Sequence, residues 1–99
     1  MNNQKLKEYS LDVRLPVTSN DRILVIGKSL LLHNAGTNTA TINGNLTLVA
    51  GATIQFNFPH PDEIIASYIR VIFSGGGINR LEIVTAVPIG FDYSNYKPQ

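Results

Sequence analysis

The 99-residue sequence contains no cysteine, which excludes a disulfide framework and thiolate chemistry. Charged residues make up only 15% of the chain, against roughly 25% in an average soluble domain. The formal net charge is +1 and Lys and Arg do not cluster, so the basic patch of a nucleic-acid-binding protein is missing. No apolar run approaches the ~18–20 residues that cross a bilayer, so we expect no membrane span.

The N-terminus also lacks a recognisable signal. Met1 to Gln4 is polar and has no apolar core of the signal-peptide kind, so we expect a protein made in a cytoplasm and not exported by the usual route. A surface with few charges is either polar in another way, through Asn, Thr and Ser, or covered by neighbours in an assembly. The length fits one domain over residues 1–99, with an N-terminal arm at 1–5 and a C-terminal arm at 88–99.

Short hydrophobic runs separated by turn residues fill the chain, and from Ile23 to Phe58 they are typical of a meandering antiparallel sheet. About eight strands predict an all-β fold, a single antiparallel β-sandwich of the jelly-roll-like kind, with a barrel as the alternative. The expected strands are Leu6–Leu15, Arg22–Ile26, Ser29–His33, Thr39–Ile42, Asn45–Val49, Thr53–Phe58, Tyr68–Phe73 and Asn79–Val87.

Local patterns make these expectations more specific. Alternation in Leu6–Leu15, with Tyr9, Leu11, Val13 and Leu15 on one face, indicates a half-buried strand, and the continuous apolar run of Arg22–Ile26 indicates burial on both faces. Asn43-Gly44 favours a type I′ hairpin turn, because both residues tolerate positive φ. We further expect a hairpin loop at Ser74–Gly77 and one helical turn at Asp62–Ser67.

Reactive groups are scarce and scattered. A zinc site would need both histidines, His33 and His60, together with Asp62 or Glu63, and we favour a solvated loop histidine instead. No Ser lies in a Gly-x-Ser-x-Gly elbow, and the glycines of Ser74–Gly77 lead to a strand and not to the helix that a phosphate cradle requires. The sequence therefore indicates no catalytic, metal or cofactor site, and we expect a protein that is not an enzyme.

Acidic residues and aromatics support the same interpretation. Asp12, Glu82 and Asp92 are expected on solvent-facing positions, and Asp62 and Glu63 are adjacent, so no facing carboxylate pair for glycoside hydrolysis stands out. Phe56, Phe58 and Phe73 alternate with polar residues as core positions do. The C-terminal aromatics are different, because the segment around them is too short to form its own core. We expect an assembly interface there and on the N-terminal strand, made by Tyr9, Phe91, Tyr93 and Tyr96.

Three stretches together carry a family resemblance that covers about Leu30 to Val84. They are Leu31–Gly44, with Asn34-Ala35-Gly36-Thr37 and Thr41-Ile42-Asn43-Gly44; Leu48–Phe56, with Gly51 and Phe56; and Ile72–Val84, with Phe73-Ser74-Gly75-Gly76-Gly77-Ile78-Asn79-Arg80-Leu81. This pattern resembles small β-rich structural proteins of bacteriophage virions, such as minor capsid, decoration, spike-base or tail-associated proteins. The residues after Val87 are outside it.

The resemblance implies a structural component of a phage particle, located in the virion and made in the host cytoplasm. It implies no catalytic residue and no cofactor. The partners to expect are further copies of the chain in a homo-oligomer and other virion proteins such as the major capsid protein.

A carbohydrate- or receptor-binding module of a phage tail or spike is the alternative. Small sandwiches present such sites on loops, and the candidate loops are Asn34–Asn38, Ser74–Asn79 and the segment around His60. A hydrolase is the least favoured hypothesis, because no convergent acid-base set stands out.

Overall fold

The computed structural model describes residues 9–57 and 64–88, which form eight strands and no helix. The prediction of an all-β chain with eight short strands is confirmed for this part of the protein. The strands are β1 Tyr9–Val13, β2 Asp21–Gly27, β3 Ser29–Asn34, β4 Thr39–Ile42, β5 Leu46–Leu48, β6 Thr53–Asn57, β7 Ile65–Ser74 and β8 Leu81–Pro88.

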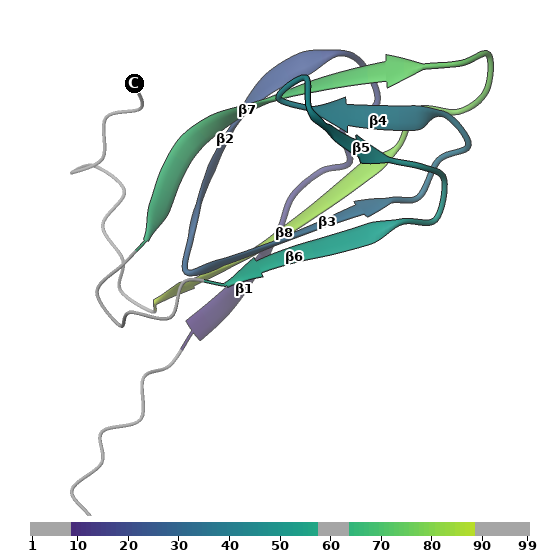
Figure 1. Cartoon of the computed structure of the whole chain (residues 1–99). Coiled ribbons are helices and arrows are strands. Elements are labelled where there is room, and N and C mark those ends of the chain that lie inside the picture. The colour runs from purple at the N-terminus through teal and green to yellow at the C-terminus, as the bar shows by residue number, and fades with distance from the viewer. Residues whose placement is uncertain (1–8, 58–63, 89–99) are drawn as a thin grey trace, which may run out of the picture.

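Two antiparallel sheets of four strands lie over one another as layers (Figure 1). The first sheet has the order β1-β8-β3-β6 and the second has the order β2-β7-β4-β5. Each described strand pairs within its own sheet, so the arrangement is sandwich-like and is not a closed barrel.

The pairing follows one rule, in which the first half of the chain folds back on the second half. β1 pairs with β8, β2 with β7, β3 with β6 and β4 with β5. Successive pairs alternate between the two sheets. Among the described strands only β4 and β5 are both consecutive in sequence and paired, so the expected meander is wrong.

The expected hairpin at Ser74–Gly77 is also wrong, because β7 belongs to the second sheet and β8 to the first. Turn residues specify that the chain reverses, but not which sheet it enters. At the link between β2 and β3, for example, the amide of Lys28 donates to the carbonyl of Ala86 in β8 at 2.6 Å. That bond directs β3 into the first sheet instead of back onto β2.

The core lies between the sheets, on the faces where alternate side chains of each strand meet. Leu32, Leu81 and Ile83 from the first sheet pack against Val25 and Val71 from the second, and all are at most 1% exposed. This burial supplies the main stabilisation of the fold, at roughly 25 cal/mol per Å² of apolar surface.

The Asn43-Gly44 turn is confirmed. Asn43 has a φ of 54° and Gly44 a φ of 78°, the positive values that both central positions of a type I′ turn require. The amide of Asn45 donates to the carbonyl of Ile42 at 3.3 Å, and pairing resumes at Ile42 and Leu46.

Three further local expectations are corrected by the structure. Ile65–Ser67 lie in β7 and not in a helical turn, because they pair with Val25–Gly27 of β2; Asp62 and Glu63 are outside the described residues. In β2 only Val25 and Gly27 are buried, since Leu24 and Ile26 point to the outer face and remain half-buried. Phe56 faces inward but is 40% exposed at the edge of the core, while Phe58 is outside the described residues.

Candidate functional site

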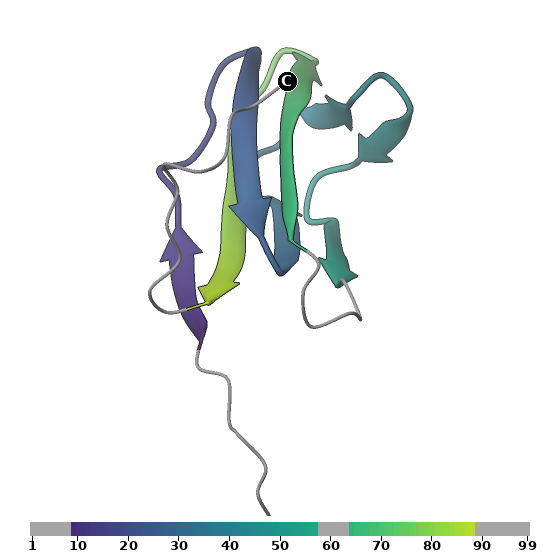
Figure 2. The ribbon, with the colours of Figure 1, turned by 90° about the vertical axis from the view of Figure 1, so that its left-hand side faces the viewer.

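The most exposed large apolar side chains of the described residues belong to β1 and the residues just after it. Leu11, Val13 and Leu15 are 72%, 70% and 90% exposed, and Tyr9 is 37% exposed. β1 ends the strand order of the first sheet, so β8 covers one edge and no described strand covers the other (Figure 2). The expectation of a half-buried strand here is therefore wrong, because all five residues of β1 are exposed.

The register explains which way these side chains point. In β8 the alternate residues Ile83 and Thr85 face the core, so Val84 and Ala86 face outward. Leu11 lies opposite Ala86 and Val13 opposite Val84, which places both on the outer face of the first sheet. The outer apolar row, as we name it, consists of Tyr9, Leu11, Val13, Leu31, Val84 and Ala86.

An extra residue after β1 separates this exposed row from the core. The amide of Arg14 donates to the carbonyl of Ile83 at 3.1 Å, and the amide of Val17 donates to that of Leu81 at 2.9 Å. Three steps along the N-terminal segment therefore match two steps along β8, which is a β-bulge, and Pro16 lies within it. The bulge turns Val17 toward the core at 9% exposure, whereas Leu15 stays outside.

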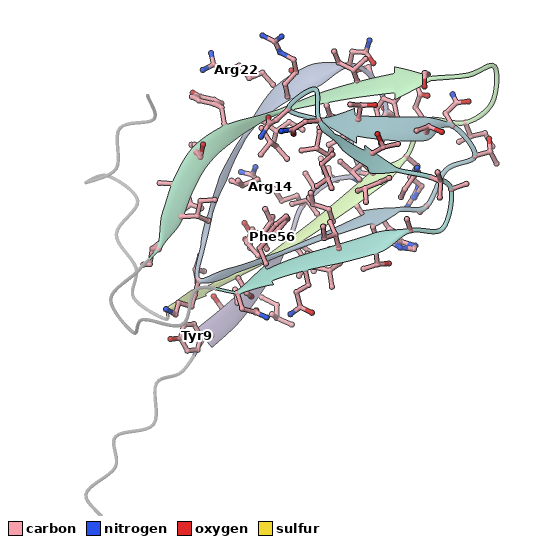
Figure 3. All side chains as sticks on the ribbon, in the orientation of Figure 1. Tyr9, Arg14, Arg22 and Phe56 are labelled. Atoms are coloured by element: carbon pink, nitrogen blue, oxygen red, sulfur yellow. The ribbon has the colours of Figure 1, made fainter. Side chains whose placement is uncertain are left out.

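The core-facing side of β1 is polar. Ser10 lies opposite Val87, and Asp12 lies opposite Thr85. Arg14 follows on the same side, and its Nη1 donates to the carbonyl of Leu24 in the second sheet. Figure 3 shows the Arg14 side chain between the two layers and Tyr9 outside them. Arg14 thus joins the two sheets where the apolar core ends.

Two of the three candidate ligand loops, Asn34–Asn38 and Ser74–Asn79, bind each other. Asn34 is fully buried, and its Nδ2 donates to the carbonyls of Asn38 and Leu48, both at 2.8 Å. Asn38 donates to Asn79 Oδ1 at 2.6 Å and accepts from the amide of Gly77 at 2.7 Å. These amide groups hold the loops together, so we assign them a structural role.

A polar hollow of about 370 Å³ lies on the outer face of the second sheet. Arg22 and Arg70 are directly opposite each other on β2 and β7, and the Arg22 guanidinium stacks over the Tyr68 ring at 4.1 Å from its centroid. Because Arg22 covers this ring, Tyr68 does not present that face as a platform for a sugar. Asn43, Gly44, Ser67 and Ile72 also line the hollow.

An apolar cleft of about 440 Å³ opens where the sheets separate beside β6. Phe56 projects into the space between the layers (Figure 3), near Leu46 of β5 and Ile65 of β7. Among the residues that the structure describes, the cleft lining contains no acid, base or nucleophile, and apart from Asn43 and Asn45 it is aliphatic or aromatic. These described residues offer burial of apolar groups.

The reactive groups of the described residues do not converge. His33 Nδ1 is 2.7 Å from Thr53 Oγ1 on the outer face, and no group of three His, Asp or Glu side chains within 9–57 and 64–88 is placed to hold a metal. His60, Asp62 and Glu63 are outside these ranges. No helix that could cross a membrane occurs in the part of the chain that the structure describes.

Of the four interface residues expected from the sequence, Tyr9 is described and exposed, while Phe91, Tyr93 and Tyr96 lie outside the described residues. The exposure of Leu11, Val13 and Leu15 was not predictable from alternation, because a period of two separates two faces without indicating which one meets the core. Pro16 was the available signal, since proline marks edges and bulges.

Comparison of the chain with protein-family models, curated proteins and solved structures finds no match.

Proposed function

We propose that this protein is a structural component of a bacteriophage particle that acts through contacts between subunits. The observation that carries the proposal is β1, an edge strand whose apolar residues Leu11 and Val13 are about 70% exposed. Soluble proteins protect such edges with charges, proline or covering loops, since bare edges pair with other chains. An assembled particle provides cover for this edge, which no described strand covers.

The strand order supports a jelly roll as the finer description of the fold. Folding the chain in half, so that β1-β8 and β3-β6 share one sheet and β2-β7 and β4-β5 share the other, gives the double-layered arrangement of that class. Jelly rolls are common in viral capsid and lectin domains. The low charge and the resemblance of Leu30–Val84 to small virion proteins point toward the capsid-type role.

The proposal locates the protein in the virion, after synthesis in the host cytoplasm. Its partners are other copies of itself and virion proteins such as the major capsid protein. It requires no cofactor and no reaction.

Mass spectrometry and immunogold labelling of purified particles, from cells that carry the gene, test the proposal. We expect the protein in the particles, and we expect Leu11→Lys with Val13→Lys to prevent its incorporation. Thr41→Lys with Thr47→Lys is the matched control, because these residues lie on the outer face of the second sheet. Wild-type protein that stays out of particles and remains monomeric at high concentration would contradict the proposal.

A carbohydrate- or receptor-binding module is the second candidate, and the polar hollow of the second sheet favours it. Arg70, Asn43 and Ser67 provide donors and acceptors suited to hydroxyl or carboxylate groups of a glycan. A glycan array would show binding that Arg70→Ala removes and that Arg80→Ala retains, since Arg80 is exposed in the loop before β8 and does not line the hollow. An array without hits would dismiss this candidate.

A further inference from the structure

The backbone of β1 has a hydrogen-bonding edge that no described strand pairs with. Arg14 donates to the carbonyl of Ile83, directly opposite it, and such bonded pairs alternate along an antiparallel ladder. Ser10 and Asp12 therefore share the orientation of Arg14 and bond to β8. Tyr9, Leu11 and Val13 turn their amides and carbonyls the other way, toward the edge that no described strand covers.

The same three residues carry the exposed apolar side chains of the strand. Edge strands are usually guarded by charged side chains, especially Lys, by Pro or by a bulge, but β1 contains no Lys or Pro from Tyr9 to Val13, and its bulge comes only after Val13. Its one charge, Asp12, lies on the core-facing side. Backbone groups that no described strand pairs with thus coincide with an apolar row on one five-residue segment.

We propose that a second copy of this chain pairs with β1, antiparallel, around a two-fold axis at Leu11. Leu11 then faces Leu11 of the second copy, and Tyr9 faces Val13 in both directions. Each of these pairs exchanges both of its backbone hydrogen bonds. This inference deepens the proposed function. It rests on it in one respect, because both assume that the protein acts through contacts between subunits.

Self-complementarity favours a second copy over an unrelated partner, because a two-fold contact presents the same patch twice. The register around Leu11 sets an aromatic residue against a β-branched one at each end, a favourable cross-strand pair. On the core-facing side it sets Ser10 against Asp12, so that the hydroxyl can donate to the carboxylate.

Charge repulsion disfavours the register that is shifted by one residue, toward Asp12. A shift that centres the contact on Asp12 places the two Asp12 carboxylates directly opposite each other, which is repulsive. A shift that centres it on Ser10 leaves Val13 without a partner inside β1. The register around Leu11 alone pairs the whole strand with itself.

The pairing also creates a sheet of eight strands that crosses the axis. The outer apolar rows of the two copies become one continuous patch at its centre. The strand contact itself is smaller than the ~800 Å² per partner of a standard interface, so we expect a dimer that forms at micromolar concentrations.

Single-cysteine variants test the register, because the chain has no other thiol. Opposite residues of a bonded pair have Cα atoms about 5.5 Å apart, within the range that a disulfide spans. We expect Leu11→Cys to form more than half disulfide-linked dimer under mild oxidation. Tyr9→Cys and Val13→Cys should cross-link when mixed and not separately. Leu15→Cys is the matched control, since it is more exposed but lies away from the axis.

Light scattering of Leu11→Pro provides a second readout. Proline removes an amide that points away from β8 and that no described strand pairs with, so we expect a folded monomer with an unchanged circular dichroism spectrum. Asp12→Pro removes an amide bonded to β8 and should lower the stability of the subunit.

Equal cross-linking of Leu11→Cys and Leu15→Cys overturns the inference. It is also overturned if the wild-type protein is still a monomer at 100 times the micromolar concentrations at which we expect the dimer. The latter result would leave another occupant for the edge, such as the chain's own residues 89–99. Leu11→Cys dimers together with absence from particles would support the inference and refute the virion role. Protein that is present in particles but forms no Leu11→Cys dimer would refute the β1 contact and support the virion role.

Discussion

Asn38 Oδ1, in the loop between β3 and β4, accepts a hydrogen bond from the amide of Gly77, 39 residues further along the chain, at 2.7 Å. The hydroxyl of Thr37 accepts from the amide of Ile78 in the same way, also at 2.7 Å. Side chains of one loop therefore bind the backbone of another loop, and they hold together the end of the sandwich where β7 passes into β8.

Asn34→Ala should destabilise the fold strongly. It removes two donated bonds and one accepted bond at a fully buried position, and it leaves the carbonyls of Asn38 and Leu48 without that donor. We expect a loss of about 2–4 kcal/mol in the free energy of unfolding, measured by urea denaturation. Asn45→Ala, an exposed asparagine, is the control and should change stability by less than about 0.5 kcal/mol.

Gly36→Ala should be far more damaging than Gly76→Ala. A Cβ at Gly36 would collide with the carbonyl oxygen of Ile78 and lie 2.7 Å from the amide nitrogen of Arg80, whereas a Cβ at Gly76 meets nothing within 4 Å. We expect a loss of about 3 kcal/mol or more for the first variant and almost none for the second. Thermal unfolding of both would show this, and similar melting temperatures would contradict the close approach at Gly36.

Arg14→Met should weaken the link between the sheets. Methionine keeps most of the apolar stem but does not donate to the carbonyl of Leu24. We expect a loss of about 1.5–3 kcal/mol, the range for a hydrogen bond from a charged donor. Arg80→Met is the comparison, since Arg80 and Glu82 form an exposed ion pair at 3.9 Å that is worth at most about 1 kcal/mol. An equal effect of the two substitutions would show that Arg14 does not join the sheets.

Asn43→Gly should be tolerated better than Asn43→Ala. Both lose the bond that Asn43 Oδ1 accepts from the amide of Arg70 at 2.9 Å, but only alanine opposes the positive φ of 54°. The difference between the two variants should be about 1–2 kcal/mol, the cost of the left-handed region for a residue with a Cβ. Urea titrations that place alanine at or above glycine would contradict the type I′ turn.

Strand positions were predictable because they depend on local chemistry. Thr39–Ile42 was expected with the bounds observed, and Asn43-Gly44 gave its turn type, since both rest on neighbouring residues alone. Sheet membership was not predictable in this way. Gly27-Lys28 and Ser74–Gly77 resemble tight reversals in sequence, yet in each case the next strand joins the other sheet.

The candidate site shows the same limit. Alternation in β1 correctly separated Tyr9, Leu11 and Val13 from Ser10 and Asp12, as the ladder with β8 shows. The sequence-based prediction placed the apolar side of β1 against the core, because apolar side chains are normally buried there. The bulge at Leu15-Pro16 depends on how Val17 meets Leu81, a contact between residues 64 positions apart, and no local pattern encodes it.

The sequence by itself determined that the chain forms short strands, where they turn, and that thiol and strongly basic chemistry are missing. Only the tertiary structure decided which strands pair, that β1 lies at an edge, and that its apolar side faces outward. The reason is physical: turns and alternation are set by residues next to each other in the chain, whereas inside and outside exist only once distant strands have packed.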